Sequence, residues 1–202
     1  MHWPAHGANP HALYKRFGLA PPTEYIDFSV NTNPYQLPPS AWPDREEWIR
    51  WAGEYPDLKA EALAALIAKQ EGVGRGQVLM TNGAAEAIYL LAALFAGRRV
   101  GVLEPTFSEY RRACFAYGCE VASFMAEEER GFSYDIEEAA AWAADRDIVF
   151  LCHPNNPTGT AMPEHELRAF IDAVGQAGTY IVVDEAFYPF WRGGFTAVRW
   201  LD

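Results

Sequence analysis

Four short segments of the sequence carry residue types that could together bind a flat, anionic ligand; they are centred on Ala84 and Ala85, Phe107, Asn156 and Asp184. The first segment turns at Gly83 into a predicted helix, whose leading N–H groups would bind an anion. The aromatic ring could stack on the ligand, the amide could donate a hydrogen bond, and the carboxylate needs a cation or hydrogen-bond donors once it is half-buried. Each segment also has an ordinary structural interpretation, as a capped turn, a core ring, a rigid loop or a carboxylate that caps the next turn.

The elements expected between these segments place all four at one edge of a sheet. Apolar runs predict strands at residues 78–81, 100–103, 121–125, 148–152 and 180–183. Runs with helical periodicity, most of them ending near a glycine, predict helices at residues 58–67, 84–95, 108–117, 135–144 and 163–176. Strict alternation of strand and helix indicates the α/β class, with a mostly parallel sheet and helices on both faces. Ligands of such sheets bind at the carboxyl ends of the strands, where the four segments lie.

An irregular N-terminal arm is expected before this sheet. Residues 1–57 contain nine of the 14 prolines and show little periodicity, apart from a short helix predicted at residues 45–51. Residues 58–202 carry the alternating pattern. The sequence therefore predicts two regions of different character.

Composition narrows the possible partners and the compartment. The 202 residues include 16 Lys and Arg against 27 Asp and Glu, and a net charge of −11 repels nucleic acid. The longest apolar run, residues 84–96, contains Glu86 and is too short to cross a membrane, and the N-terminus lacks a secretory signal. Three cysteines, an odd number without metal-ligand spacing, favour reduced thiols in a cytoplasmic protein: Cys114, Cys119 and Cys152.

An anion site, a stacking ring, an amide donor and a carboxylate at one sheet edge are together what a pyridoxal phosphate site requires. The helix start would bind the phosphate, and the amide would donate to the 3-oxygen of the ring. The carboxylate would keep the pyridine nitrogen protonated, so that the ring can draw electrons from the Cα of the substrate.

Longer motifs carry a family resemblance. The chain resembles the fold-type I, pyridoxal-phosphate-dependent aminotransferases of class I and II in NGAAEAI (82–88), PTFSEY (105–110), HPNNPTG (153–159) and VVDEAF (182–187). Further motifs make it similar first to the threonine-phosphate decarboxylases of cobalamin biosynthesis and next to the histidinol-phosphate aminotransferases: HGAN (6–9), DFSVNTNP (27–34) and YPD (55–57). The resemblance covers nearly the whole chain. It implies that residues 58–202 are part of a pyridoxal-phosphate-binding large domain.

The resemblance implies a role for each matching residue. The cofactor would be bound by Ala84, Ala85, Phe107, Asn156, Asp184 and, from the neighbouring subunit of a homodimer, Tyr55. The phosphorylated substrate would be bound by His6, Gly7, Asn31 and Asn156. Two residues depart from the family pattern: Ala8 replaces a glycine, and Phe187 removes a phenol that many relatives place against the 3-oxygen.

The family's Schiff-base lysine has no counterpart in this sequence. It follows the DEAF segment in a Ser-x-x-Lys motif, whereas Lys15, Lys59 and Lys69 all precede residue 78. No catalytic residue is assigned, and we expect a truncated chain, inactive alone, without the last strands and the small C-terminal domain. Without those strands, the strand at residues 78–81 would have no neighbour.

Two classes of function remain open. The first is an enzyme of this family, which would decarboxylate L-threonine O-3-phosphate or, as the alternative, transaminate histidinol phosphate. The second is a non-catalytic fragment, or one half of a split enzyme, that docks on a partner.

Overall fold

The computed structural model describes residues 9–26, 28, 30, 31, 33, 35 and 37–201. The chain divides into two compact units, Met1–Pro56 and Asp57–Asp202, and this boundary lies next to the predicted end of the arm. None of the helices in the described ranges combines the length and apolarity needed to span a bilayer.

The first unit consists of short helices joined by irregular chain. Its helices are α1 (Pro10–Arg16), a 3-10 turn η1 (Pro39–Ala41) and α2 (Arg45–Gly53), so the helix predicted at residues 45–51 is confirmed. Both α-helices are capped at their N-termini by a side chain: Asn9 accepts a hydrogen bond from the Ala12 N–H at 3.1 Å, and Asp44 accepts one from the Glu47 N–H at 2.9 Å. None of the residues described in this unit is buried, so its helices lack a core of their own.

The second unit contains the predicted parallel sheet. Its strands are β1 (Arg99–Glu104), β2 (Glu120–Met125), β3 (Ile148–Cys152) and β4 (Tyr180–Asp184). All neighbours are parallel, in the order β2-β1-β3-β4. Val100 pairs with both Val121 and Ile148, which fixes the register around β1. All five residues of β3 are buried, as expected for a strand with a neighbour on each side and a helical layer on each face.

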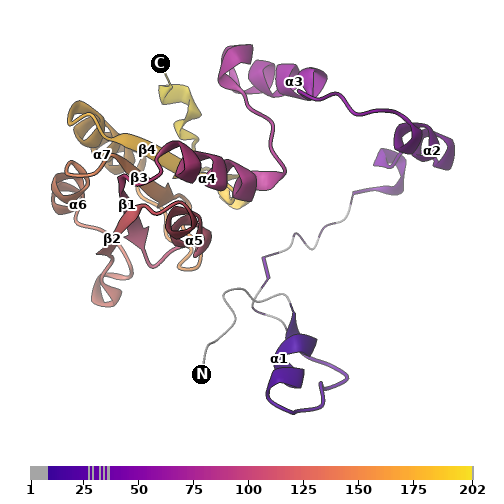
Figure 1. The fold of residues 1–202 in the computed structure, drawn as a ribbon, viewed down its shortest axis with the longest axis horizontal. Helices are drawn as coiled ribbons and strands as arrows, with labels where there is room; N and C mark the ends of the chain where they lie inside the picture. The colour runs from indigo at the N-terminus through magenta and orange to yellow at the C-terminus, as the bar shows by residue number, and fades with distance from the viewer. Residues whose placement is uncertain are drawn as a thin grey trace. The chain divides into compact units, whose positions relative to one another are not determined.

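Helices cover both faces of this sheet, which confirms the predicted fold class (Figure 1). The helices of the unit are α3 (Glu61–Glu71), α4 (Gly83–Leu94), α5 (Glu109–Ala116), α6 (Ile136–Ala143) and α7 (Glu164–Gln176), with 3-10 turns at Arg75–Gln77, Glu128–Arg130, Tyr188–Phe190 and Ala197–Trp200. On one face Val102 and Phe150 share an apolar cluster with Tyr110 of α5 and with residues of α4. On the other face Leu151 shares a cluster with Leu167 of α7 and with residues of α6. The alternation along each strand sends successive side chains into these two cores.

The strand predicted at residues 78–81 is wrong. These residues belong to no strand, and the side chain of Leu79 is 75% exposed. The physical reason is the absence of a neighbouring strand among the described residues, because an extended segment forms a ladder only when another strand accepts its hydrogen bonds.

We predict that Gly101→Ala destabilises the second unit. A Cβ at Gly101 would lie 2.9 Å from the Trp142 ring and 2.9 Å from a methyl group of Val149, so the buried layer between β1 and α6 must shift. We expect urea unfolding to show a loss of about 1–3 kcal/mol in the free energy of unfolding. The control is Gly175→Ala in α7, where no atom lies within 4 Å of the new Cβ and a gain of about 0.5–1 kcal/mol is expected. An unchanged unfolding midpoint for Gly101→Ala would contradict this packing.

Candidate functional site

The structure brings the five residues predicted to hold the cofactor within one subunit around a single cavity of about 210 Å³. The cavity is lined by Ala84, Ala85, Phe107, Tyr110, Cys152, Asn156, Asp184, Ala186 and Phe187. These residues come from the start of α4, the loop after β1 with the first turn of α5, the end of β3 with its following loop, and the end of β4. The predicted juxtaposition at the carboxyl edge of the sheet is therefore present, whereas the role of each residue in cofactor binding stays a prediction.

One wall of the cavity is the start of α4. Gly83 has a positive φ of 73°, which permits the sharp turn into the helix. Asn82 occupies the N-cap position of α4, but its side chain does not cap the helix; instead the Glu86 carboxylate accepts the Asn82 N–H at 2.5 Å. In the part of the chain that the structure describes, the Ala84 and Ala85 N–H groups have no acceptor. They can therefore donate to an anion at the positive end of a 12-residue helix.

Another part of the lining is Asp184, the last residue of β4. Its Oδ2 accepts a hydrogen bond from the Tyr110 hydroxyl at 2.7 Å, and its Oδ1 accepts one from the Ala186 N–H at 3.0 Å. The hydrogen-bond donors that a half-buried carboxylate needs are therefore present. The hydrogen bond from the Ala186 N–H also caps the turn after β4, which is the ordinary structural interpretation given to this residue above. Burial raises the pKa of Tyr110, and the nearby Cys152 and Asp184 raise it further, so the phenol remains a donor. Each carboxylate oxygen keeps capacity for a ligand donor.

Aromatic rings form the apolar part of the cavity. Phe107 lies edge-to-face against Tyr110, with ring centroids 5.8 Å apart and an interplanar angle of 84°. Tyr110 in turn stacks on Phe150 at 5.3 Å and 16°. Phe187 adds a second ring to the lining. A flat ligand would meet rings that are already ordered by the core.

The loop after β3 contains two asparagines with different tasks. Asn155 is 7% exposed, and its side chain accepts from the Thr106 hydroxyl at 2.9 Å and donates to the Pro105 carbonyl at 2.8 Å and the Thr158 hydroxyl at 2.7 Å. It therefore joins this loop to the loop after β1. Asn156 is half-buried and lines the cavity, and no hydrogen bond joins its side-chain amide to another described residue. Asn156 is the amide that remains available to a ligand.

The remaining predicted residues are not placed on this cavity. Tyr55 and Asn31 belong to the first unit, where both are exposed. His6 and Gly7, with the departure at Ala8, lie outside the described residues. The three lysines are exposed, and none belongs to the lining of the cavity: Lys15, Lys59 and Lys69.

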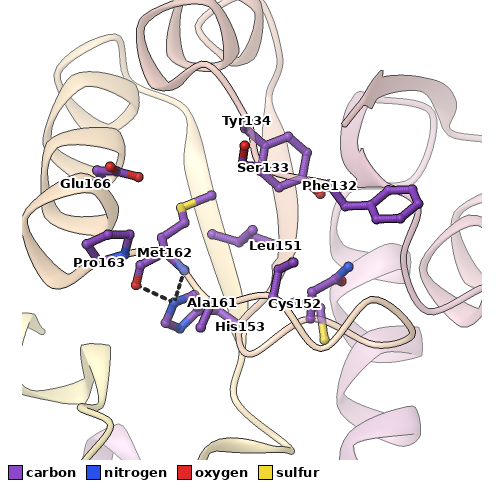
Figure 2. A pocket seen from close by; sticks show the side chains of 12 residues that line it. Phe132, Ser133, Tyr134, Leu151, Cys152, His153, Ala161, Met162, Pro163 and Glu166 are labelled. Atoms are coloured by element: carbon purple, nitrogen blue, oxygen red, sulfur yellow. Dashed lines mark hydrogen bonds between the residues drawn. The ribbon is translucent and has the colours of Figure 1, made fainter. Parts of the chain in front are cut away.

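A second, smaller cavity of about 70 Å³ lies beside His153, between the end of β3 and the start of α7 (Figure 2). His153 is 2% exposed, and its Nε2 lies 3.0 Å from the Met162 nitrogen and 3.2 Å from the Met162 oxygen. Burial lowers the pKa of His153, and its Nδ1 has no hydrogen-bond partner among the residues that the structure describes. The contacts of the buried imidazole with the Met162 backbone indicate a structural histidine rather than a ligand site.

Sequence reasoning missed Tyr110. The PTFSEY motif contains it, but only the structure shows that its hydroxyl binds Asp184, 74 residues away in the chain. One signal was present: a tyrosine in an amphipathic helix that faces a sheet is buried, and a buried phenol needs an acceptor.

The chain belongs to the family "Aminotransferase class I and II", which it matches over residues 23–201; members of this family generally depend on pyridoxal phosphate. It is 32% identical over 186 residues to the threonine-phosphate decarboxylase of Salmonella typhimurium, covering 92% of this chain and 51% of that protein. It is also 32% identical over 189 residues to histidinol-phosphate aminotransferase 2 of Bacillus cereus, covering 91% and 49% respectively. The crystal structure of L-threonine-O-3-phosphate decarboxylase from Porphyromonas gingivalis matches with a TM-score of 0.60 at 29% identity, over 72% of this chain and 44% of that one.

These comparisons confirm the predicted family and fold class. The chain spans about half the length of the curated relatives it matches.

We predict that Asn155 contributes to the stability of the fold, whereas Asn156 does not. Asn155→Ala leaves the Thr106 hydroxyl and the Pro105 carbonyl without their partner, so we expect a loss of about 1–3 kcal/mol in the free energy of unfolding. Asn156→Ala is the matched control and should change it by less than about 0.5 kcal/mol. Urea unfolding of both variants measures the difference, and equal losses would contradict the assignment.

We predict that His153 makes the chain less stable in acid. Because its pKa is lowered in the folded state, the unfolded chain binds the proton more readily as the pH falls below about 6.5. The free energy of unfolding should then decrease by up to about 1.4 kcal/mol per pH unit, until the pH reaches the folded pKa. Above pH 6.5 both states are neutral at this residue, and it adds no pH dependence.

Urea unfolding between pH 7.5 and 5.5 measures this effect. His153→Gln should flatten the pH dependence, whereas His165→Gln, at a side chain that is 83% exposed, should leave it as in the wild type. An identical slope in the wild type and His153→Gln would refute the prediction.

Proposed function

We propose that this chain supplies the cofactor-binding face of a pyridoxal-phosphate-dependent enzyme that acts on a phosphorylated amino acid or amine. One observation carries the proposal: a helix start, an aromatic ring, a free amide and a hydrogen-bonded carboxylate converge on a single cavity. Membership of the class I and II aminotransferase family supports the same cofactor.

The chemistry of the lining suits the proposed group. The cavity, about 210 Å³, is smaller than the roughly 300–1,000 Å³ pockets of drug-sized ligands and suits one substituted ring. No lysine or arginine is among the residues that line it, so the phosphate would be bound by the N–H groups of Ala84 and Ala85 and the helix dipole. When bound, pyridoxal phosphate draws electrons from the Cα of the substrate.

The residues of this chain would orient the group and hold one proton. Asp184, fixed by two donors, would keep a proton on the pyridine nitrogen. Asn156 would donate to the 3-oxygen alone, since Phe187 has no hydroxyl to share that contact. Phe107 and Phe187 would exclude water from the faces of the ring.

The substrate proposed first is L-threonine O-3-phosphate, which a decarboxylase of cobalamin biosynthesis would convert with loss of CO₂. Histidinol phosphate is the second candidate, because the similarity to an aminotransferase of that substrate reaches the same 32% identity. Both compounds carry an amine and a phosphate, and we propose that His6, Gly7, Asn31 and Asn156 bind them. Assaying the full-length protein with each amino phosphate would separate the two reactions.

We propose a homodimer in which Tyr55 reaches the cofactor phosphate of the neighbouring subunit. Two features support an interface for the first unit: Tyr55 is 86% exposed, and none of the unit's described residues is buried.

We propose a cytoplasmic location for the protein. The three cysteines form no disulfide and are buried, which suits the reducing cytoplasm.

A non-catalytic role is the candidate of another class. It is favoured by the position of the lysines, none of which lines the cavity. The chain would then act only by docking on a partner that carries the lysine. Co-purification with such a polypeptide would support this role.

The test of the cofactor site is a titration of the chain with pyridoxal 5′-phosphate, followed by equilibrium dialysis. We expect non-covalent binding, weakened about 10- to 100-fold by Asp184→Ala, because a charged hydrogen-bond partner is removed. Asp172→Ala is the control, since Asp172 is exposed in α7 and pairs with Arg168. Equal binding by the wild type and Asp184→Ala would contradict the site, and borohydride fixation onto a lysine of this chain would contradict the non-covalent mode.

A further inference from the structure

We propose that Tyr110 is the positioning residue of this cavity: its hydroxyl fixes the carboxylate of Asp184, and its ring fixes Phe107. The inference rests on the proposed cofactor site and adds to it a residue that would never touch the reacting atoms. Tyr110 would act through its two neighbours, which would meet the ligand.

The geometry makes Tyr110 rigid. Its side chain is fully buried, with 0% exposed, in the first turn of α5. One face of the ring stacks on Phe150 of β3, and the Phe107 ring packs against it edge-to-face. With its ring held by these contacts, the position of the hydroxyl oxygen is fixed, 2.7 Å from Oδ2 of Asp184, to which it donates.

The carboxylate needs this support because of where it lies. Asp184 is the last residue of β4, and after it the chain leaves the sheet. The Ala186 N–H binds only Oδ1, so without Tyr110 the carboxylate would lose its second donor and could turn more freely about its Cβ–Cγ bond. Burial raises the pKa of the phenol, which therefore stays protonated and keeps donating across the pH range of an enzyme.

One rigid ring thus couples two recognition elements. Phe107 is proposed to contact the ring of the ligand, and Asp184 is proposed to bind its nitrogen. Since Tyr110 contacts both, the distance between the stacking surface and the carboxylate is set by the core rather than by the ligand. Binding then orders few side chains, which is the physical meaning of preorganisation.

The chain offers a matched control for this hydrogen bond. The Tyr89 hydroxyl donates to the carboxylate of Glu109 at 3.2 Å, and Glu109 is 8% exposed. Neither residue lines the cavity. Tyr89→Phe therefore removes the same chemical contact at a place that the proposal leaves uninvolved.

The experiment compares Tyr110→Phe with Tyr89→Phe by equilibrium dialysis against pyridoxal 5′-phosphate. We expect Tyr110→Phe to weaken binding about tenfold, and Tyr89→Phe to change it less than twofold. In an Asp184→Ala background, Tyr110→Phe should add less than about a twofold effect, because the partner through which the hydroxyl acts is gone.

A spectroscopic readout distinguishes positioning from general support of the fold. Pyridoxamine 5′-phosphate, which has no aldehyde, is bound to each variant, and its absorbance is followed against pH. The pH at which the bound ring nitrogen loses its proton should fall by about one unit in Tyr110→Phe, the equivalent of the tenfold effect. It should be unchanged in Tyr89→Phe.

Each other outcome is decisive. Wild-type binding by Tyr110→Phe, with weakened binding by Asp184→Ala, would overturn this inference and leave the proposed function standing. Unweakened binding by Asp184→Ala would overturn both. An equal effect of Tyr110→Phe in the presence and absence of Asp184, or a Tyr110→Phe chain that does not fold by circular dichroism, would assign the tyrosine to the fold and overturn its positioning role.

Discussion

The double burial of β3 is the constraint on which the rest of this structure depends. Its residues alternate between two apolar cores, one under α4 and α5 and one under α6 and α7. A strand in this position must have neighbours on both sides, because its backbone groups have no access to water. Parallel pairing with β1 and β4 then sends three carboxyl ends to the same edge. Parallel pairing alone therefore places the polar residues that follow these strands close together at that edge.

The sheet therefore determines where the cavity lies, and contacts between the loops and helices around it fix the positions of its lining residues. Asn155 joins the loop after β3 to the loop after β1, and the Tyr110 hydroxyl joins α5 to the end of β4. Both contacts use buried polar groups, whose hydrogen bonds are strong and directional in an apolar surrounding. The cavity-lining residues Asn156 and Asp184 each stand next to such a contact. The rigidity of the cavity thus comes from hydrogen bonds between the loops and helices around it.

The sequence predicted those parts of the fold that depend on local pattern. The four strands and the helices between them follow from apolar runs and glycine stops, and the residues at the strand ends follow from topology. The strand predicted at residues 78–81 is absent because a strand needs a neighbour, and the expected lack of that neighbour was itself readable from the sequence. The start of α4 differs from a simple capped turn, because the backbone N–H and the side-chain amide of Asn82 both donate to the Glu86 carboxylate. Tyr110 and Asn155 were missed since their partners lie 74 and 49 residues away.

The outer side of β4 has a physical consequence for the part of the chain that the structure describes. Among the described residues β4 is the last strand of the sheet, and its sequence Tyr180-Ile-Val-Val is apolar and uncharged. An edge of this kind offers a row of unsatisfied amides and carbonyls to any extended segment that approaches it. Among the described residues, the strand that carries the carboxylate of the cavity is therefore also a strand whose outer edge has no ladder partner.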